Sequence, residues 1–177
     1  MTNGPLYGLV AWPCPELDGW LRALQARLNV RAYGEPHLNL RAPFPADVPE
    51  ETLVHDLRAL LSGVPAFEVH VSGWRYFPGI VFLECTLGPD LAALHDHVLT
   101  LPSAPPQPYD QKAYIPHLTL ALGVLPWAQP TLEATLAPLV PPVQHFEVSA
   151  LSLTVEAGGE VREVHTFPLT APTPHPH

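Results

Sequence analysis

Leucines spaced three or four residues apart occur in four stretches of the chain, and this spacing predicts four amphipathic helices. The first stretch begins at Pro15, a residue type that suits the first turn of a helix, and ends near Asn29. Its leucines share one helical face and polar residues fill the other, so we expect the leucine face to pack on a core. The other predicted helices are centred on residues 53–61, 91–101 and 132–139.

Between these helices, short runs of apolar or alternating residues predict about seven strands. Two pairs of runs are separated by glycine-containing turns and predict β-hairpins: residues 67–77 with 80–87, and residues 146–155 with 161–168. Single strands are expected at residues 7–12, 37–40 and 117–122. The mixture of strands and helices predicts an α+β fold.

The 177 residues are enough for one domain with a sizeable core. We place that domain at residues 1–168, made of two interleaved lobes, and expect residues 169–177 to form a flexible tail because they lack core-forming side chains. Hydrophobic residues make up 47% of the chain and charged residues 14%. This composition excludes intrinsic disorder, although 24 residues are proline.

The formal net charge of −9 argues against an extended nucleic-acid interface, because such an interface draws its affinity from many phosphate contacts. A small anionic ligand in a local site is compatible with this charge. Cys14 and Cys85 fit no zinc or redox spacing and predict two reduced thiols. No stretch has the pattern of a signal peptide or a membrane span, so we expect a cytoplasmic monomer without membrane contact.

One short motif occurs twice, as PHLNL at residues 36–40 and PHLTL at residues 116–120. The copies are 80 residues apart, near half the chain, as an internal duplication would give. Alternate residues of a strand face the same side, so His37 points with Asn39, and His117 points with Thr119. If the two halves pack about a pseudo-two-fold axis, these pairs meet across a groove.

A groove with two such pairs suits the chemistry of a phosphodiester. One imidazole can accept a proton from the attacking nucleophile while the other protonates the leaving oxygen. The side chains of Asn39 and Thr119 can donate hydrogen bonds to the phosphate oxygens on which charge develops. The predicted reaction needs no metal and no other cofactor.

The motifs and the residues around them resemble the two-histidine (2H) phosphoesterase superfamily, in its RNA 2′,3′-cyclic phosphodiesterase and 2′-5′ RNA ligase-like branch. Residues 71–77, 80–84 and 91–95 are similar to that family's central hairpin and following helix, and residues 114–120 match its second motif. Asn39 departs from the family, which has Thr or Ser at this position.

The resemblance implies a bilobal fold with a pseudo-two-fold axis, in which antiparallel sheets line a central groove and helices lie outside. It also implies metal-independent catalysis by His37 and His117 and a part in RNA processing. The expected substrate is a 2′,3′-cyclic phosphate or a related 2′-linked phosphodiester, on an RNA end or a nucleotide. A 2′-5′ RNA ligase-like activity stays open.

Arg41 continues the alternation of the first motif and is the first candidate for a phosphate clamp beside Asn39 and Thr119. Other side chains near the motifs are candidates for contacts with the substrate. These candidates are Arg75, Lys112, Tyr33, Tyr114 and Phe77.

Two other readings of the same residues stay open. Asn39 and the acidic chain favour a protein that binds a nucleotide or an RNA end without turning it over. The ten histidines would suit a metal-dependent hydrolase, but no histidine pair has ligand spacing within its predicted element.

Overall fold

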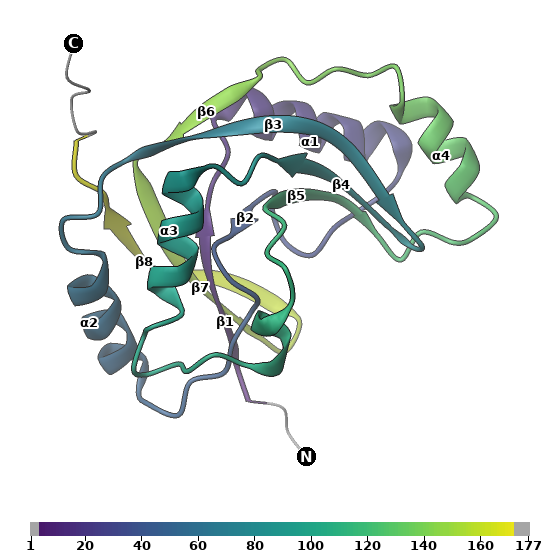
Figure 1. The fold of residues 1–177 in the computed structure, drawn as a ribbon. Coiled ribbons are helices and arrows are strands. Elements are labelled where there is room, and N and C mark those ends of the chain that lie inside the picture. Colours follow the sequence, from purple (N-terminus) through teal and green to yellow (C-terminus); the bar gives the residue numbers. More distant parts are fainter. Residues whose placement is uncertain (1–3, 172–177) are drawn as a thin grey trace, which may run out of the picture.

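The computed structural model describes residues 4–171, which form eight strands and four α-helices, and the predicted α+β class is confirmed (Figure 1). The strands are β1 (Leu6–Ala11), β2 (Leu38–Asn39), β3 (Phe67–Phe77), β4 (Ile80–Cys85), β5 (His117–Leu122), β6 (His145–Val148), β7 (Ala150–Ala157) and β8 (Glu160–Pro168). The helices are α1 (Pro15–Leu28), α2 (Glu50–Leu61), α3 (Pro89–Val98) and α4 (Gln129–Leu136), with a short 3-10 helix η1 (Pro108–Gln111). Within residues 4–171, no helix is long and apolar enough to span a membrane.

The eight strands join in one curled antiparallel sheet, in the order β6-β3-β4-β5-β2-β1-β7-β8 (Figure 1). The pairing of β2 with β5 connects the two halves of this sheet edge to edge. The order is symmetric about this junction: β4 and β1 flank it, followed by β3 and β7, and then by β6 and β8. This symmetry agrees with a pseudo-two-fold arrangement whose axis passes between the two motif strands.

Helices α1 and α3 each follow a strand of one half of the sheet and make contacts with the other half. Helix α1 follows β1, yet it packs against β5, where Gln25 donates a side-chain hydrogen bond of 3.0 Å to the carbonyl of Leu120. Helix α3 follows β4, yet His95 donates from Nδ1 to the carbonyl of Leu40 over 2.7 Å. Contacts of these two helices therefore link the two halves of the sheet.

The leucines of both motifs form the centre of the hydrophobic core. Leu38, Leu40, Leu118 and Leu120 have no exposed surface and belong to one cluster with the buried leucines of the helices. Burying a leucine side chain contributes about 1.5–3 kcal/mol, so this cluster holds the motif strands firmly. Because side chains alternate along a strand, the residues between these leucines face the opposite, open side of the sheet.

Two boundaries differ from the predictions. The predicted strand at residues 146–155 is interrupted at Ser149, because β6 pairs with β3 whereas β7 pairs with β1 and β8. Leu169 and Thr170, assigned to the tail, donate backbone hydrogen bonds of 2.9 Å to Ser149 and Val64. The rest of the predicted tail, residues 172–177, lies outside the described residues.

Candidate active site

Antiparallel pairing of β2 with β5 brings the two motifs together. Leu38 lies directly opposite Leu118, so the register sets His37 across from Thr119 and Asn39 across from His117. All four polar side chains share the open face. The histidines are diagonal neighbours in this register, a relation that separates residues on paired strands by about 7–8 Å. A single phosphate group can bridge that distance.

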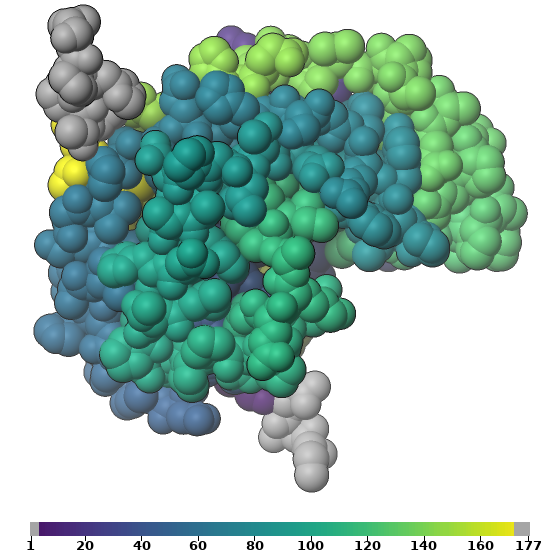
Figure 2. All heavy atoms as spheres, viewed as in Figure 1, coloured from purple at the N-terminus to yellow at the C-terminus, as the bar shows by residue number. Residues whose placement is uncertain are grey.

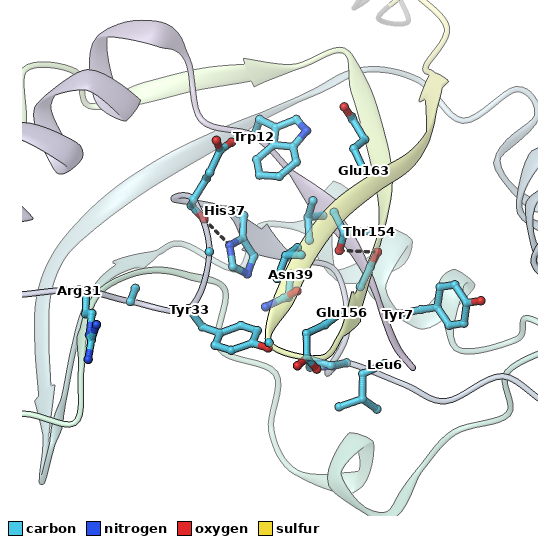
Figure 3. A pocket seen from close by; sticks show the side chains of 18 residues that line it. Leu6, Tyr7, Trp12, Arg31, Tyr33, His37, Asn39, Thr154, Glu156 and Glu163 are labelled. Atoms are coloured by element: carbon cyan, nitrogen blue, oxygen red, sulfur yellow. Dashed lines mark hydrogen bonds between the residues drawn. The ribbon is translucent and has the colours of Figure 1, made fainter. Parts of the chain in front are cut away.

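Each histidine is held by the same local contact. His37 Nδ1 lies 2.6 Å from the carbonyl of Glu35 (Figure 3). His117 Nδ1 lies 2.7 Å from the carbonyl of Ile115. A carbonyl oxygen can only accept, so Nδ1 of each ring carries the proton. Each Nε2 is therefore the atom that can take up or deliver a proton in catalysis.

The His117 ring is more enclosed than an ordinary surface histidine. It packs on the ring of Phe82 with centroids 4.4 Å apart, and Glu84 lies across the strands from it. Burial lowers the pKa of His117, and the nearby His37 lowers it further. The hydrogen bond to Ile115 and the charge of Glu84 oppose this shift without reversing it. His117 therefore favours its neutral form, which suits a general base.

A pocket of about 920 Å³ opens beside His37 and Asn39. It is lined by β1, β2, β7, β8 and the segment 31–35, and both motif residues contribute to its wall (Figure 3). Tyr33, a predicted substrate contact, also lines it. His117 and Thr119 are not among the lining residues, so the pocket extends from the reactive pair toward β7 and β8. Its volume is in the range of small-ligand sites.

One wall of the pocket is a hydrogen-bonded chain that the sequence reasoning missed. Trp12 Nε1 donates to Ser152 Oγ over 2.9 Å, and Ser152 Oγ donates to Glu163 Oε1 over 2.5 Å. The Trp12 ring stands edge-on to His37, with centroids 6.3 Å apart. Thr166 also donates to Glu163 Oε1, and these hydrogen bonds, with that from Ser152 the strongest, lower the pKa of Glu163.

The floor of the pocket depends on close contact between β1 and β7. Gly8 lies opposite Thr154, and a Cβ atom at Gly8 would stand 2.8 Å from Thr154 Oγ1. Glycine is therefore the residue that fits here without displacing the threonine. At the pocket's other side, the nearby Glu156 carboxylate raises the pKa of Tyr33.

Alternation within β1, β7 and β8 is the signal that could identify these wall residues. It places Gly8 and Val10 on one side of β1, and Trp12 follows directly after the strand. Strand β7, with which β1 pairs here, begins only at Ala150, so the sequence pattern alone did not join these residues into a wall.

Two predicted substrate contacts lie on the His117 side of the open face. Arg75 forms an ion pair with Glu84 over 2.9 Å, and its guanidinium stands 5.3 Å from the ring centroid of Phe77. Phe77 stacks on Phe82, which in turn contacts His117. Arg75 and Phe77 thus lie near His117, on the side of the open face away from the pocket.

Arg41 does not lie on the open face, and this prediction is wrong. Its guanidinium is 1% exposed and bonds to the carbonyl of Ala104 over 2.7 Å and to Asp110 over 2.9 Å. Strand β2 ends at Asn39, so the alternation used to place Arg41 stops before it. Arg41 is thus a structural ion-pair partner rather than a phosphate clamp.

Two further candidates contact protein instead of the pocket. The Tyr114 hydroxyl donates to the carbonyl of Asn39 over 2.7 Å, and its ring stacks on His95 at 4.0 Å. Burial raises the pKa of Tyr114. Lys112 places its ammonium 4.5 Å from the ring centroid of Tyr109, outside the pocket lining. Tyr114 supports the first motif from behind through the Asn39 backbone.

A metal site does not emerge from the side chains that the structure describes. Within residues 4–171, no three His, Cys, Asp or Glu side chains gather in an arrangement that could hold a metal ion.

Comparisons with known proteins agree with this architecture. A sequence model of the 2′-5′ RNA ligase superfamily matches residues 13–160. No curated protein matches the chain at a significant level.

Several solved structures share the fold. E. coli LigT complexed with 3′-AMP is 17% identical, with a TM-score of 0.61 over 95% of this chain and 99% of LigT. LigT complexed with ATP is 16% identical, with a TM-score of 0.57 over 94% and 99% of the two chains. A protein described as a phosphoesterase is 18% identical, with a TM-score of 0.61 over 94% and 99%. The fold is that of the LigT-like 2H phosphoesterases, and the chain belongs to the 2′-5′ RNA ligase superfamily.

Proposed function

We propose that this protein is a phosphoesterase that hydrolyses a 2′,3′-cyclic phosphate, or a related 2′-linked phosphodiester, on a nucleotide or an RNA end. The observation that carries the proposal is the shared face of His37 and His117, each anchored through Nδ1 to the carbonyl two residues earlier. Membership of the superfamily supports a phosphoesterase-type activity.

In the proposed reaction, His117 is the general base and His37 the general acid. His117 Nε2 takes a proton from water as the water oxygen bonds to phosphorus. The bond from phosphorus to one ribose oxygen breaks, and His37 Nε2 delivers its proton to that oxygen. The product is a phosphomonoester with a free neighbouring hydroxyl, and proton exchange with solvent restores both rings. The lowered pKa of His117 favours it as the base.

Asn39 and Thr119 are proposed to hold the phosphate. In the strand register each lies across from the histidine of the other motif, so a phosphate between the rings meets a donor on both sides. An amide can donate as a hydroxyl does, so Asn39 can fulfil this role. A donor aimed at developing negative charge contributes about 10²–10³ in rate.

The pocket is proposed to receive the nucleoside attached to that phosphate. LigT has been crystallised with 3′-AMP and with ATP, which supports a nucleotide ligand for the shared fold. Trp12 and Tyr33 lie on either side of His37 in Figure 3, and aromatic rings of this kind stack on bases.

The proposal is tested by hydrolysis of 2′,3′-cyclic nucleotides in the presence of EDTA. We expect His37→Ala and His117→Ala each to lower kcat by at least about 10²-fold, as loss of a general acid or base does. His55→Ala, at an exposed position of α2, is the matched control and keeps wild-type turnover. An active protein in which either motif variant keeps wild-type kcat would contradict the two-histidine mechanism.

A second candidate function is nucleotide binding without turnover, which Asn39 favours because it replaces the family's hydroxyl side chain. In that case the wild-type protein binds a nucleotide, yet no product forms from any cyclic nucleotide tested. The same assay, combined with a titration of binding, separates the two functions.

A further inference from the structure

Trp12 lies just beyond the end of β1, where strand pairing no longer orients the side chains. Its ring lines the pocket and stands edge-on to His37, and the next residue, Pro13, has no N–H to donate. A half-buried indole in such a place can turn about its side-chain bonds unless another group holds it. The polar group of the ring is Nε1–H, which can only donate a hydrogen bond.

The hydroxyl of Ser152, on β7, holds this indole. Ser152 is 1% exposed and lies opposite Val10 in the strand register, so its side chain lies at the base of the wall beside Trp12. Nε1 of Trp12 donates to Ser152 Oγ over 2.9 Å. A buried hydroxyl costs free energy unless it is hydrogen-bonded, so the bonds that Ser152 makes account for a serine at this position.

The Glu163 carboxylate sets the direction of these hydrogen bonds. A carboxylate only accepts, so the Ser152 hydroxyl donates its single proton to Glu163 Oε1 over 2.5 Å. The oxygen of Ser152 then remains as the acceptor for the indole. The Glu163 side chain is exposed, and the hydrogen bond from Ser152, followed by that from Thr166, lowers its pKa. Glu163 therefore stays ionised at neutral pH, and the direction is kept.

We propose that Ser152 is a positioning residue, whose buried hydroxyl fixes the Trp12 indole in the orientation that contacts the nucleoside in the pocket. The inference rests on the proposed function, since it assumes that the pocket receives the nucleoside. Ser152 is not among the described residues that line the pocket, so it acts on the ligand through Trp12. Figure 3 shows the Trp12 ring between His37 and Glu163, beside the position of the reacting phosphate.

Binding of 3′-AMP, a stable ligand, tests the inference independently of turnover. We expect Trp12→Ala to weaken binding by about tenfold or more, because it removes a ring that stacks on the base. Ser152→Ala keeps the ring but releases it, so affinity falls by about three- to fivefold, the effect of one hydrogen bond. Trp12→Phe loses Nε1–H and leaves the buried serine in place, and it should lower affinity by a similar factor. Isothermal titration measures the dissociation constants.

A double-mutant cycle separates positioning from a general loss of stability. Ser152→Ala and Trp12→Phe remove the same hydrogen bond, so their effects are not additive. We expect the double variant to bind 3′-AMP within about twofold of Trp12→Phe alone. Thr166→Val is the matched control, because it removes the other hydroxyl that donates to Glu163 and leaves the bond between Trp12 and Ser152 intact. It keeps wild-type affinity, and thermal unfolding of each variant checks that the fold is kept.

The indole N–H of Trp12 provides a readout that needs no ligand. Trp12→Phe identifies its NMR signal by loss, and a hydrogen-bonded N–H exchanges with solvent more slowly than a free one. Exchange at Trp12 should be at least about threefold faster in Ser152→Ala and unchanged in Thr166→Val. In assays with a 2′,3′-cyclic nucleotide, KM of Ser152→Ala rises by the same factor as the dissociation constant, and the change in kcat is the smaller one.

The outcomes separate this inference from the proposed function. Wild-type affinity of Ser152→Ala for 3′-AMP would overturn the positioning role, and so would a further loss of the same size when Ser152→Ala is added to Trp12→Phe. Absence of cyclic-nucleotide hydrolysis with the binding pattern preserved would overturn the reaction alone. Failure of the wild-type protein to bind 3′-AMP would overturn both.

Discussion

At the scale of single residues, the two histidines owe their orientation to backbone carbonyls rather than to carboxylates. Nδ1 of each ring donates two residues back along its own chain, to Glu35 and to Ile115. Both copies of the motif have this contact, so in each copy the histidine is oriented by the carbonyl two residues before it. The tautomer that leaves Nε2 reactive follows from the motif itself.

The surroundings of His117 predict the pH dependence of the reaction. Its pKa is lowered by burial, so the ring loses its proton at a lower pH than the ordinary histidine value of about 6.5. If His117 is the base, kcat/KM rises on the acidic side with a midpoint below that value and falls again when the acid loses its proton. Steady-state assays from about pH 5 to pH 9 measure the profile.

Titration of the imidazole signals by NMR provides the independent check of this prediction. The His117→Ala variant identifies the His117 signal by its loss, and the exposed His55 is the reference histidine. A His117 midpoint at or above that of His55 would contradict the assignment.

Residue-scale reasoning from the sequence held beside the paired motif residues and failed beyond the end of β2. His37 with Asn39, and His117 with Thr119, share a face because the motif leucines between them are buried. Arg41 was misplaced because it lies beyond the end of β2, where the alternation no longer applies.

At the scale of elements, the shortest strand has the central position. Strand β2 contains two residues, yet it pairs with β1 on one side and with β5 on the other. So short a strand needs support from outside the sheet. The Tyr114 hydroxyl on the Asn39 carbonyl and His95 on the Leu40 carbonyl provide it.

A buried ion pair joins the segment of residues 104–110, at the start of η1, to Arg41 just after β2. Arg41 and Asp110 are 1% and 2% exposed, and Asp110 also accepts the backbone N–H of Gln107. Arg41→Ala leaves the Asp110 carboxylate buried without its partner, so we expect the free energy of unfolding to fall by about 3–5 kcal/mol. Urea denaturation followed by circular dichroism measures this loss.

The double variant Arg41→Met/Asp110→Leu is the control for this ion pair. Replacing both charges with apolar side chains removes the unpaired carboxylate and should recover most of the stability. An Arg41→Ala protein of wild-type stability but with strongly raised KM would instead show Arg41 to be a phosphate ligand.

At the scale of the whole molecule, the net charge of −9 limits how much nucleic acid the surface can hold. The space-filling view is hollowed between the tip of the β3–β4 hairpin and the segment around η1 (Figure 2). A local recess on an acidic surface suits the end of a nucleic acid, whereas an extended strand would meet repulsion along its path.

RNA length therefore has little influence on affinity. We expect a twelve-nucleotide RNA with a 3′-phosphate to bind within about threefold of a dinucleotide, because few phosphates beyond the first meet a cation. The slope of log K against log salt should be no steeper than about −1.4, the value for two phosphate contacts on a single strand. Fluorescence anisotropy over a salt series measures both quantities, and a steep rise of affinity with length would contradict the prediction.

Features that depend on neighbours along the chain could be predicted from the sequence. Leucine spacing located the four helices, and the repeated motif identified His37 and His117 together with the residues that share their face. Helical and strand periods are local properties, and so is the alternation that separates core leucines from polar side chains.

The choice of neighbouring strands, in contrast, depends on the tertiary structure. The pairing of β1 with β7 joins Val10 to Ser152 and so builds the wall of Trp12, Ser152 and Glu163. The segment 103–111 folds against Arg41, which the sequence suggested as a phosphate ligand. Arg41 is therefore buried and paired with Asp110. Such contacts join residues far apart in the chain, and they arise from strand pairing and from the packing of distant segments against each other. The local periodicity of the sequence does not encode these long-range contacts. The shape and charge of the pocket depend on them.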